Sequence, residues 1–124
     1  MHSGPKTLCA DDLAHFTGTE HWYRHPLVPS VTYTDGARYV AQAGGAYWLL
    51  DEIAFAQRFN KLVAAAPFQL WRLTVDLDRQ SAVLICEDGN NRPIAAKEIT
   101  FTDFPLAEIR FYVTDNVILL PSEY

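Results

Sequence analysis

From Phe68 the sequence changes to a period of two, in which apolar residues alternate with polar ones: Trp71, Leu73, Val75 and Leu77 with Arg72, Thr74 and Asp76. Successive side chains of a β-strand point to opposite faces, so this pattern predicts a strand with one buried face. A second, largely apolar run follows a turn at Asp78-Arg79. Pairing the two runs outward from that turn aligns apolar residues on one face: Trp71 with Cys86, Leu73 with Leu84, and Val75 with Ala82. Because neither run slips to the other face in this register, we predict an antiparallel hairpin here.

Two further segments extend this hairpin into a meander. Residues 94–101 follow a loop rich in Gly and Asn and are expected to form a third strand, in a register that turns Lys97 toward the buried side. Residues 109–113 and 117–120 flank Asp115-Asn116 and are expected to form a last hairpin.

The N-terminal half carries helical periodicity instead. Residues 7–16 place three apolar side chains on one helical face: Cys9, Leu13 and Phe16. Residues 46–65, ended by Pro67, are expected to form the main helix. Its predicted apolar face contains Leu49, Ile53, Ala56, Phe59 and Val63. Two polar residues, Glu52 and Asn60, fall within the same arc.

Between these helices, Asp35-Gly36 is a two-residue turn signal. It predicts a hairpin that sets Tyr33 opposite Arg38 and Val31 opposite Val40. The expected fold is a single α+β domain over residues 1–124: an antiparallel meander sheet packed by one long helix, with a short N-terminal helix and a DG hairpin.

The composition excludes several classes of protein. Apolar residues make up 49% of the chain and charged residues 20%, which argues against a disordered segment. The net charge of −5 and the scattered basic residues argue against a nucleic-acid partner. The longest purely apolar run, residues 46–50, is far too short to span a membrane. The first residues lack the apolar core of a signal peptide, and the two cysteines form no C-x-x-C pair, so we expect a cytoplasmic protein with reduced thiols.

The segment TGTEHWYRHP, residues 17–26, contains the first candidate site. His21 and His25 have the i, i+4 spacing with which two imidazoles share a metal on a helix, and residues 17–20 resemble a capping box. However, Trp22 stands where zinc proteases carry a glutamate, and Pro26 makes His25 a poor helical ligand. No third ligand is evident nearby. We therefore predict no metal or other cofactor and expect the histidines to straddle a surface turn.

Glu52 is the second candidate. A carboxylate among apolar neighbours has a raised pKa and can act as a general acid or base. The same position also suits an acid at the positive end of the helix dipole, or one in a buried ion pair with Arg38 or Arg72. The sequence does not choose among these roles.

The third candidate is a trio, Trp22, Tyr23 and Arg24. These residue types dominate the binding energy of many protein interfaces, so the trio is a candidate contact surface. The alternative is that one aromatic ring caps the core while the other stays half exposed.

Several stretches together resemble a known family: FTGTEHWYRH, TDGARYVAQAGGAYWLLDEIA, FQLWRLTV, CEDGN, FTDFPL and LLPSEY. The chain is similar over nearly its whole length to small bacterial proteins classed as a domain of unknown function. The resemblance implies a single-domain protein of bacterial, plasmid or phage origin, and it implies no activity and no site residues.

The sequence therefore leaves two hypotheses. The leading one is a non-enzymatic protein-binding or regulatory module, acting on a protein partner or as a homodimer, with Trp22, Tyr23 and Arg24 at its surface. The alternative is a small enzyme or metal-binding protein that uses His21, His25 and Glu52.

Overall fold

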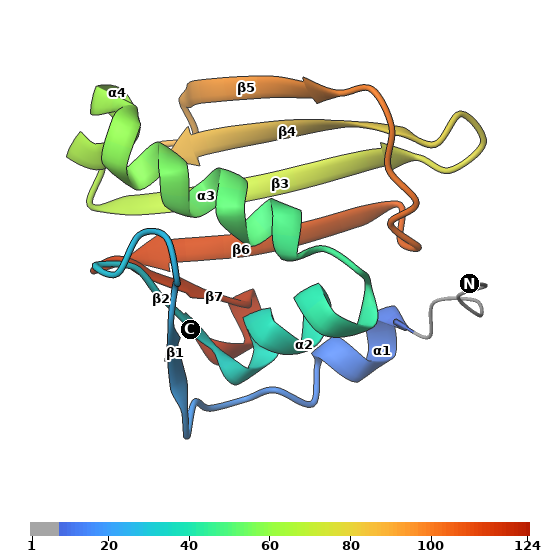
Figure 1. Cartoon of the computed structure of the whole chain (residues 1–124), viewed down its shortest axis with the longest axis horizontal. Helices are drawn as coiled ribbons and strands as arrows, with labels where there is room; N and C mark the ends of the chain where they lie inside the picture. The colour runs from blue at the N-terminus through green and yellow to red at the C-terminus, as the bar shows by residue number, and fades with distance from the viewer. Residues whose placement is uncertain (1–7) are drawn as a thin grey trace.

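The computed structural model describes residues 8–124, which form a seven-stranded mixed sheet with helices packed on one face (Figure 1). The strands are β1 (Trp22–Arg24), β2 (Thr32–Thr34), β3 (Phe68–Asp76), β4 (Ser81–Asp88), β5 (Pro93–Ile99), β6 (Glu108–Thr114) and β7 (Val117–Leu119). The helices are α1 (Ala10–Leu13), α2 (Asp35–Ala43), α3 (Tyr47–Phe59), α4 (Lys61–Ala65) and the 3-10 turn η1 (Pro121–Glu123).

The sheet order is β1-β2-β7-β6-β3-β4-β5. All neighbouring strands are antiparallel except β2 and β7, which pair in parallel. The expectation of a purely antiparallel meander is therefore wrong. It holds from β3 to β5, but the N-terminal strands β1 and β2 join the sheet beside the last strand of the chain.

The central hairpin has the predicted register. Three Cα pairs match the prediction: Trp71 with Cys86, Leu73 with Leu84, and Val75 with Ala82. The last hairpin is also confirmed, because Asp115 and Asn116 both have positive φ values, 51° and 61°, as a tight hairpin turn requires. Lys97 lies opposite Leu84, on the helix-covered face where the expected register placed it.

The predicted DG hairpin is wrong, because Asp35 begins helix α2 instead. Thr34 precedes it as the N-cap, and its side-chain oxygen accepts a hydrogen bond from the Ala37 amide at 3.3 Å. The following side chains bury at helical spacing, with Ala37, Val40 and Ala41 all inside the core. Tyr33 pairs with Tyr23 of β1 rather than with Arg38.

The long helix expected over residues 46–65 is divided at Asn60. This residue has an extended backbone, with φ −107° and ψ 111°, and its side chain accepts hydrogen bonds from the Leu62 and Val63 amides at the start of α4. Asn60 is thus a cap rather than a buried polar residue. The break turns Phe59 out of the core, so that 72% of its surface is exposed, contrary to the prediction.

The N-terminal helix is shorter than expected. Only α1 is helical, and Thr7, where the predicted helix began, lies outside the described residues. Leu13 and Phe16 pack against the core while Cys9 is exposed. Residues 17–20 form a loop and not the predicted capping box of a helix.

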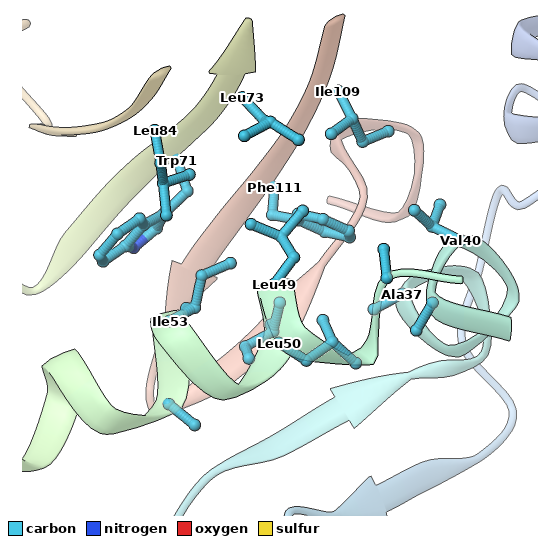
Figure 2. Close-up of a cluster of buried hydrophobic side chains, with 14 of the residues drawn as sticks. Ala37, Val40, Leu49, Leu50, Ile53, Trp71, Leu73, Leu84, Ile109 and Phe111 are labelled. Carbon is cyan, nitrogen blue, oxygen red and sulfur yellow. The ribbon is translucent and has the colours of Figure 1, made fainter. Parts of the chain in front are cut away.

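The hydrophobic core lies between the helices and the sheet (Figure 2). Leu49 and Ile53 of α3 are among the buried side chains on the helix side, and Leu73, Phe111 and Ile109 lie on the sheet side. None of the described helices combines the length and the apolar composition needed to cross a membrane.

Candidate binding groove

A groove of about 700 Å³ lies between α2 and the loop that leads from α1 to β1. This is within the size range of ligand sites, about 300 to 1,000 Å³. The loop forms one wall with residues 15–20. The other wall is one face of α2, on which the lining residues recur at helical spacing: Asp35, Arg38, Tyr39 and Gln42.

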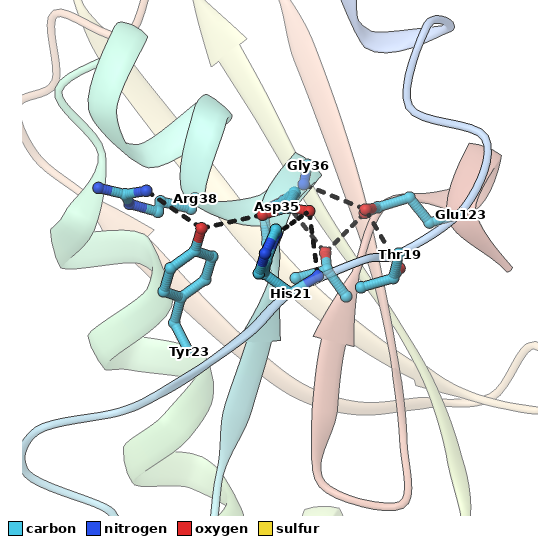
Figure 3. A network of polar contacts seen from close by, with 9 residues as sticks. Thr19, His21, Tyr23, Asp35, Gly36, Arg38 and Glu123 are labelled. Atoms are coloured by element: carbon cyan, nitrogen blue, oxygen red, sulfur yellow. Dashed lines mark hydrogen bonds and ion pairs between the residues drawn. The ribbon is translucent and has the colours of Figure 1, made fainter.

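The charged side chain of this wall, Arg38, is held in place by Tyr23 (Figure 3). Its Nη1 donates a hydrogen bond to the Tyr23 hydroxyl at 3.1 Å, and its Cζ lies 4.6 Å from the centroid of the Tyr23 ring. The Tyr23 hydrogen bond, with a further contribution from Tyr47, raises the pKa of Arg38. The guanidinium is therefore a fixed positive charge at the edge of the groove.

Tyr23 is itself fixed by Asp35. Its hydroxyl donates to Asp35 Oδ1 at 2.9 Å, and the His21 backbone amide donates to Oδ2 at 3.2 Å. Desolvation alone would raise the pKa of Asp35, but these hydrogen bonds outweigh it and hold that pKa below its ordinary value of 3.8. Asp35, Tyr23 and Arg38 thus form a chain in which an ionised carboxylate orients the phenol and the phenol orients the guanidinium.

A second carboxylate, Glu123, closes the N-terminus of α2. Its Oε1 accepts hydrogen bonds from the Thr34 hydroxyl at 2.6 Å and the Leu120 amide at 2.9 Å. Its Oε2 accepts from the Gly36 amide at 3.1 Å and the Thr19 hydroxyl at 3.4 Å. The chain therefore supplies its own anion to the helix end and at the same time anchors the loop wall of the groove. The sequence pattern does not reveal Glu123, because three of its partners, Thr19, Thr34 and Gly36, are at least 87 positions away.

His21 and His25 do not share a site. The His21 side chain is exposed, with Nδ1 3.6 Å from Asp35 Oδ2. His25 is buried, and its Nε2 lies 2.7 Å from Asp51 Oδ1. They flank strand β1 and do not lie on one turn of a helix. Four extended residues span about 13 Å, which keeps the two imidazoles apart. Nowhere in residues 8–124 do three His, Cys, Asp or Glu side chains gather in a way that could hold a metal ion.

His25 has a structural role instead. Its Nδ1 accepts hydrogen bonds from the backbone amides of Leu27 and Val28 at 3.1 and 3.0 Å. The ring proton is therefore placed on Nε2, which donates to Asp51 of α3. This arrangement fastens the loop between β1 and β2 to the main helix.

Glu52 is not the buried carboxylate that the helical projection indicated. Its side chain is 33% exposed and meets Lys97 of β5, with 2.7 Å between Oε1 and Nζ. Neither expected arginine is its partner, since Arg38 stacks on Tyr23 and Arg72 pairs with Glu87. Glu52 and Lys97, two of the three polar residues that the patterns placed on the buried side, are thus partners of each other.

The trio Trp22, Tyr23 and Arg24 is divided between two surfaces. Because β1 is a strand, Tyr23 points toward α2 and stacks on Tyr33 with 5.7 Å between ring centroids. Trp22, 56% exposed, and Arg24 point to the other face of the sheet. The trio does not form one contact patch.

The sequence comparison agrees with the extent of this fold. Residues 7–124 match the model of a family described as a family of unknown function (DUF6876). The chain belongs to the DUF6876 family. The match spans every residue of the groove and of the sheet described above. No curated protein and no solved structure matches this DUF6876 chain, so arguments about its function start from its own geometry.

Proposed function

We propose that this DUF6876 protein is a non-enzymatic binding module that holds a carboxylate-bearing segment of a partner protein in the groove beside α2. The observation that supports this most directly is the fixed position of Arg38 at the groove. Its contacts with Tyr23 use only part of the five N–H donors of a guanidinium. The others suit a carboxylate, which a guanidinium binds through two parallel hydrogen bonds.

The rest of the groove favours an apolar neighbour for that carboxylate. The rings of Phe16 and Tyr39 lie 5.3 Å apart at the groove, and the Tyr39 hydroxyl donates to Asp12 at 3.2 Å. Burial is the largest cause that raises the pKa of Tyr39, and the hydrogen bond to Asp12 raises it further. The Tyr39 side chain therefore stays uncharged. Aromatic rings of this kind supply large contact area for a side chain beside the recognised acid.

Charge limits the class of partner further. Glu20 and Asp35 also line the groove, and the whole chain has a net charge of −5. A run of acidic residues would be repelled by these groups. The expected partner segment therefore carries a single Asp or Glu, or a terminal carboxylate, next to apolar residues.

Fixing Arg38 before binding also lowers the cost of binding. A free arginine side chain carries about 2 kcal/mol of rotamer entropy, part of which is lost when it meets a ligand. Asp35 and Tyr23 restrict Arg38 before the partner arrives. The cytoplasmic location, the bacterial, plasmid or phage origin and the regulatory role inferred from the sequence belong to this proposal.

The first prediction concerns Arg38. Selection of random peptides displayed on phage is expected to enrich single acidic residues flanked by apolar ones on the wild-type protein. Arg38→Gln is expected to weaken binding of a selected peptide at least about tenfold by calorimetry, because a hydrogen bond to a charged group contributes about 1.5–3 kcal/mol. Arg58→Gln makes the same charge change outside the groove, where Arg58 stacks on Phe59, and should bind like the wild type.

Tyr23→Phe separates positioning from direct contact. It keeps the ring under the guanidinium and removes the hydroxyl that joins Asp35 to Arg38. A smaller loss of affinity is expected than for Arg38→Gln. Enriched peptides without a carboxylate, or equal binding by Arg38→Gln and wild type, would overturn the proposal.

A further inference from the structure

The face of the sheet opposite the helices, called the outer face below, offers a second surface. Helices α2, α3 and α4 lie on the other side in Figure 1. Along β3, Trp71 and Leu73 are buried under them while the alternate residues remain half exposed. In β3 and β4 the fully buried side chains therefore all lie on the helix-covered face of the sheet. The outer face nevertheless carries large apolar side chains: Phe68, Leu70, Val83, Ile85, Tyr112 and Tyr124.

Three aromatic rings form one end of this face. Phe68 and Tyr112 lie 5.0 Å apart between centroids, and Tyr124 packs edge-on against both, at 5.4 and 5.3 Å. The Tyr124 side chain is largely exposed. A contiguous exposed apolar area of this kind marks an interaction surface more often than a solvated one.

Arg72 lies on the outer face, in the middle of β3. On an open sheet an arginine normally extends its charged end into water. Arg72 instead lies against the sheet: its Nη2 bonds to Glu87 at 3.1 Å, and its Nε is occluded and lacks a hydrogen-bond partner among the described residues. A charged pair held against the sheet in this way projects less far than an extended arginine, which favours the packing of another sheet on this face.

The charges on this face favour a second copy of the chain as the occupant. Arg72 pairs with Glu87, and Arg110 pairs with Glu108 at 2.6 Å, so these four charges cancel on a face that also carries Asp76 and Glu98. Glu108 and Arg110 are also two residues apart on one exposed side of β6. About a two-fold axis between them, each acid meets the arginine of the other copy.

The available area is of the right order. Strands β6, β3, β4 and β5, spaced about 4.8 Å apart and rising about 3.3 Å per residue, give a footprint of roughly 19 by 23 Å. This projection is about half of the roughly 800 Å² that each partner buries in a stable interface. Further interface area comes from the side chains that project from the sheet, from the short strands β1, β2 and β7, and from Tyr124.

We propose that the outer face packs against the outer face of a second copy, with the two β6 strands antiparallel across a two-fold axis. This interface is separate from the groove, so it stands or falls independently of the function proposed above. Trp22 and Arg24 point to this same side of the sheet, at its far edge, and so belong to the proposed interface.

Sedimentation velocity over a concentration series tests the proposal. The wild type is expected to form a dimer at concentrations up to about 0.5 mM. E108R and R110E each place like charges opposite one another and are expected to weaken dimerisation at least about tenfold. Mixing the two variants restores opposite charges across the axis and should give a heterodimer. The control R58E makes the same kind of change on α3, on the helix side, and should dimerise like the wild type.

Circular dichroism and peptide binding to the groove show whether the variants are folded. A wild type that stays monomeric up to about 0.5 mM overturns the proposal. So does a dimer that both variants leave unchanged, or a mixture of E108R and R110E that stays monomeric.

Discussion

Position 36 has no room for a side chain. A Cβ built on Gly36 would lie 2.5 Å from Glu123 Oε1 and 2.7 Å from Leu120 Cδ1. Glu123 cannot move aside without losing hydrogen bonds to Thr34, Gly36 and Leu120. The glycine of the Asp35-Gly36 pair is therefore required by close contact with the C-terminal segment and not by a hairpin turn.

The corresponding prediction is a loss of stability in Gly36→Ala. Overpacking costs about 1–3 kcal/mol, and the gain of about 1 kcal/mol in helix propensity offsets part of it, so a net loss of up to about 2 kcal/mol is expected in urea unfolding. Gly18→Ala is the matched control, since a Cβ at Gly18 has no neighbour within 4 Å. Equal free energies of unfolding for the two variants would contradict the close contact at position 36.

Residue patterns identified anomalies better than they identified partners. The helical projection marked Glu52 and Asn60 as out of place, and strand register marked Lys97. Each has a partner that a one-dimensional pattern does not contain: Glu52 and Lys97 are 45 positions apart, and Asn60 bonds to the backbone of the next helix. The same limit applies to Arg38, whose role depends on Tyr23 in another element.

At the scale of elements, the break between α3 and α4 depends on one side chain. Asn60 caps α4 through two backbone amides, those of Leu62 and Val63. Asn60→Ala is expected to lower the free energy of unfolding by about 1 kcal/mol, whereas Asn60→Asp keeps an acceptor and should change it little. If the alanine variant instead gains stability and helical circular dichroism, a continuous helix over residues 46–65 is available to the chain and the cap does not decide the break.

Elements with long, regular patterns were predictable from the sequence. The β3–β4 register followed from alternation over many residues, and the turn at Asp115-Asn116 followed from residues that tolerate positive φ. Strands β1 and β2 are three residues each, too short to show alternation. The parallel pairing of β2 with β7 joins opposite ends of the chain, and no local signal specifies it.

At the scale of the whole molecule, the two thiols differ in their accessibility to a thiol reagent. Cys9 is exposed, whereas Cys86 is buried in the sheet and burial raises its pKa to about 12. One thiol is therefore expected to react at once with a chromogenic disulfide reagent, and the second only as the protein unfolds. Raising the pH from 7 to about 9 should not give Cys86 a fast reaction in the folded protein, because burial keeps its pKa at about 12 and the group remains a thiol there. Cys9→Ser should remove the fast phase alone, and two equal rates in native buffer would contradict the burial of Cys86.

Only part of the candidate site could be predicted from the sequence, because the rest depends on the arrangement of the whole molecule. Tyr23 was identified from residue type, and it does contact the groove arginine. The groove itself needs a loop, a helix and the Glu123 carboxylate brought together. The outer face is recognised only once α2, α3 and α4 are placed on one side of the sheet.

The contact between Glu123 and α2 has a consequence for synthesis. Gly36 and Glu123 are separated by 87 positions, so helix α2 leaves the ribosome long before its capping carboxylate is made. At about 5–20 residues per second, the wait is roughly 4 to 17 s. Strand β2 waits a similar time for β7. During that interval the nascent chain presents an unpaired strand edge and a helix that has only its Thr34 cap, the state in which a ribosome-associated chaperone would meet it.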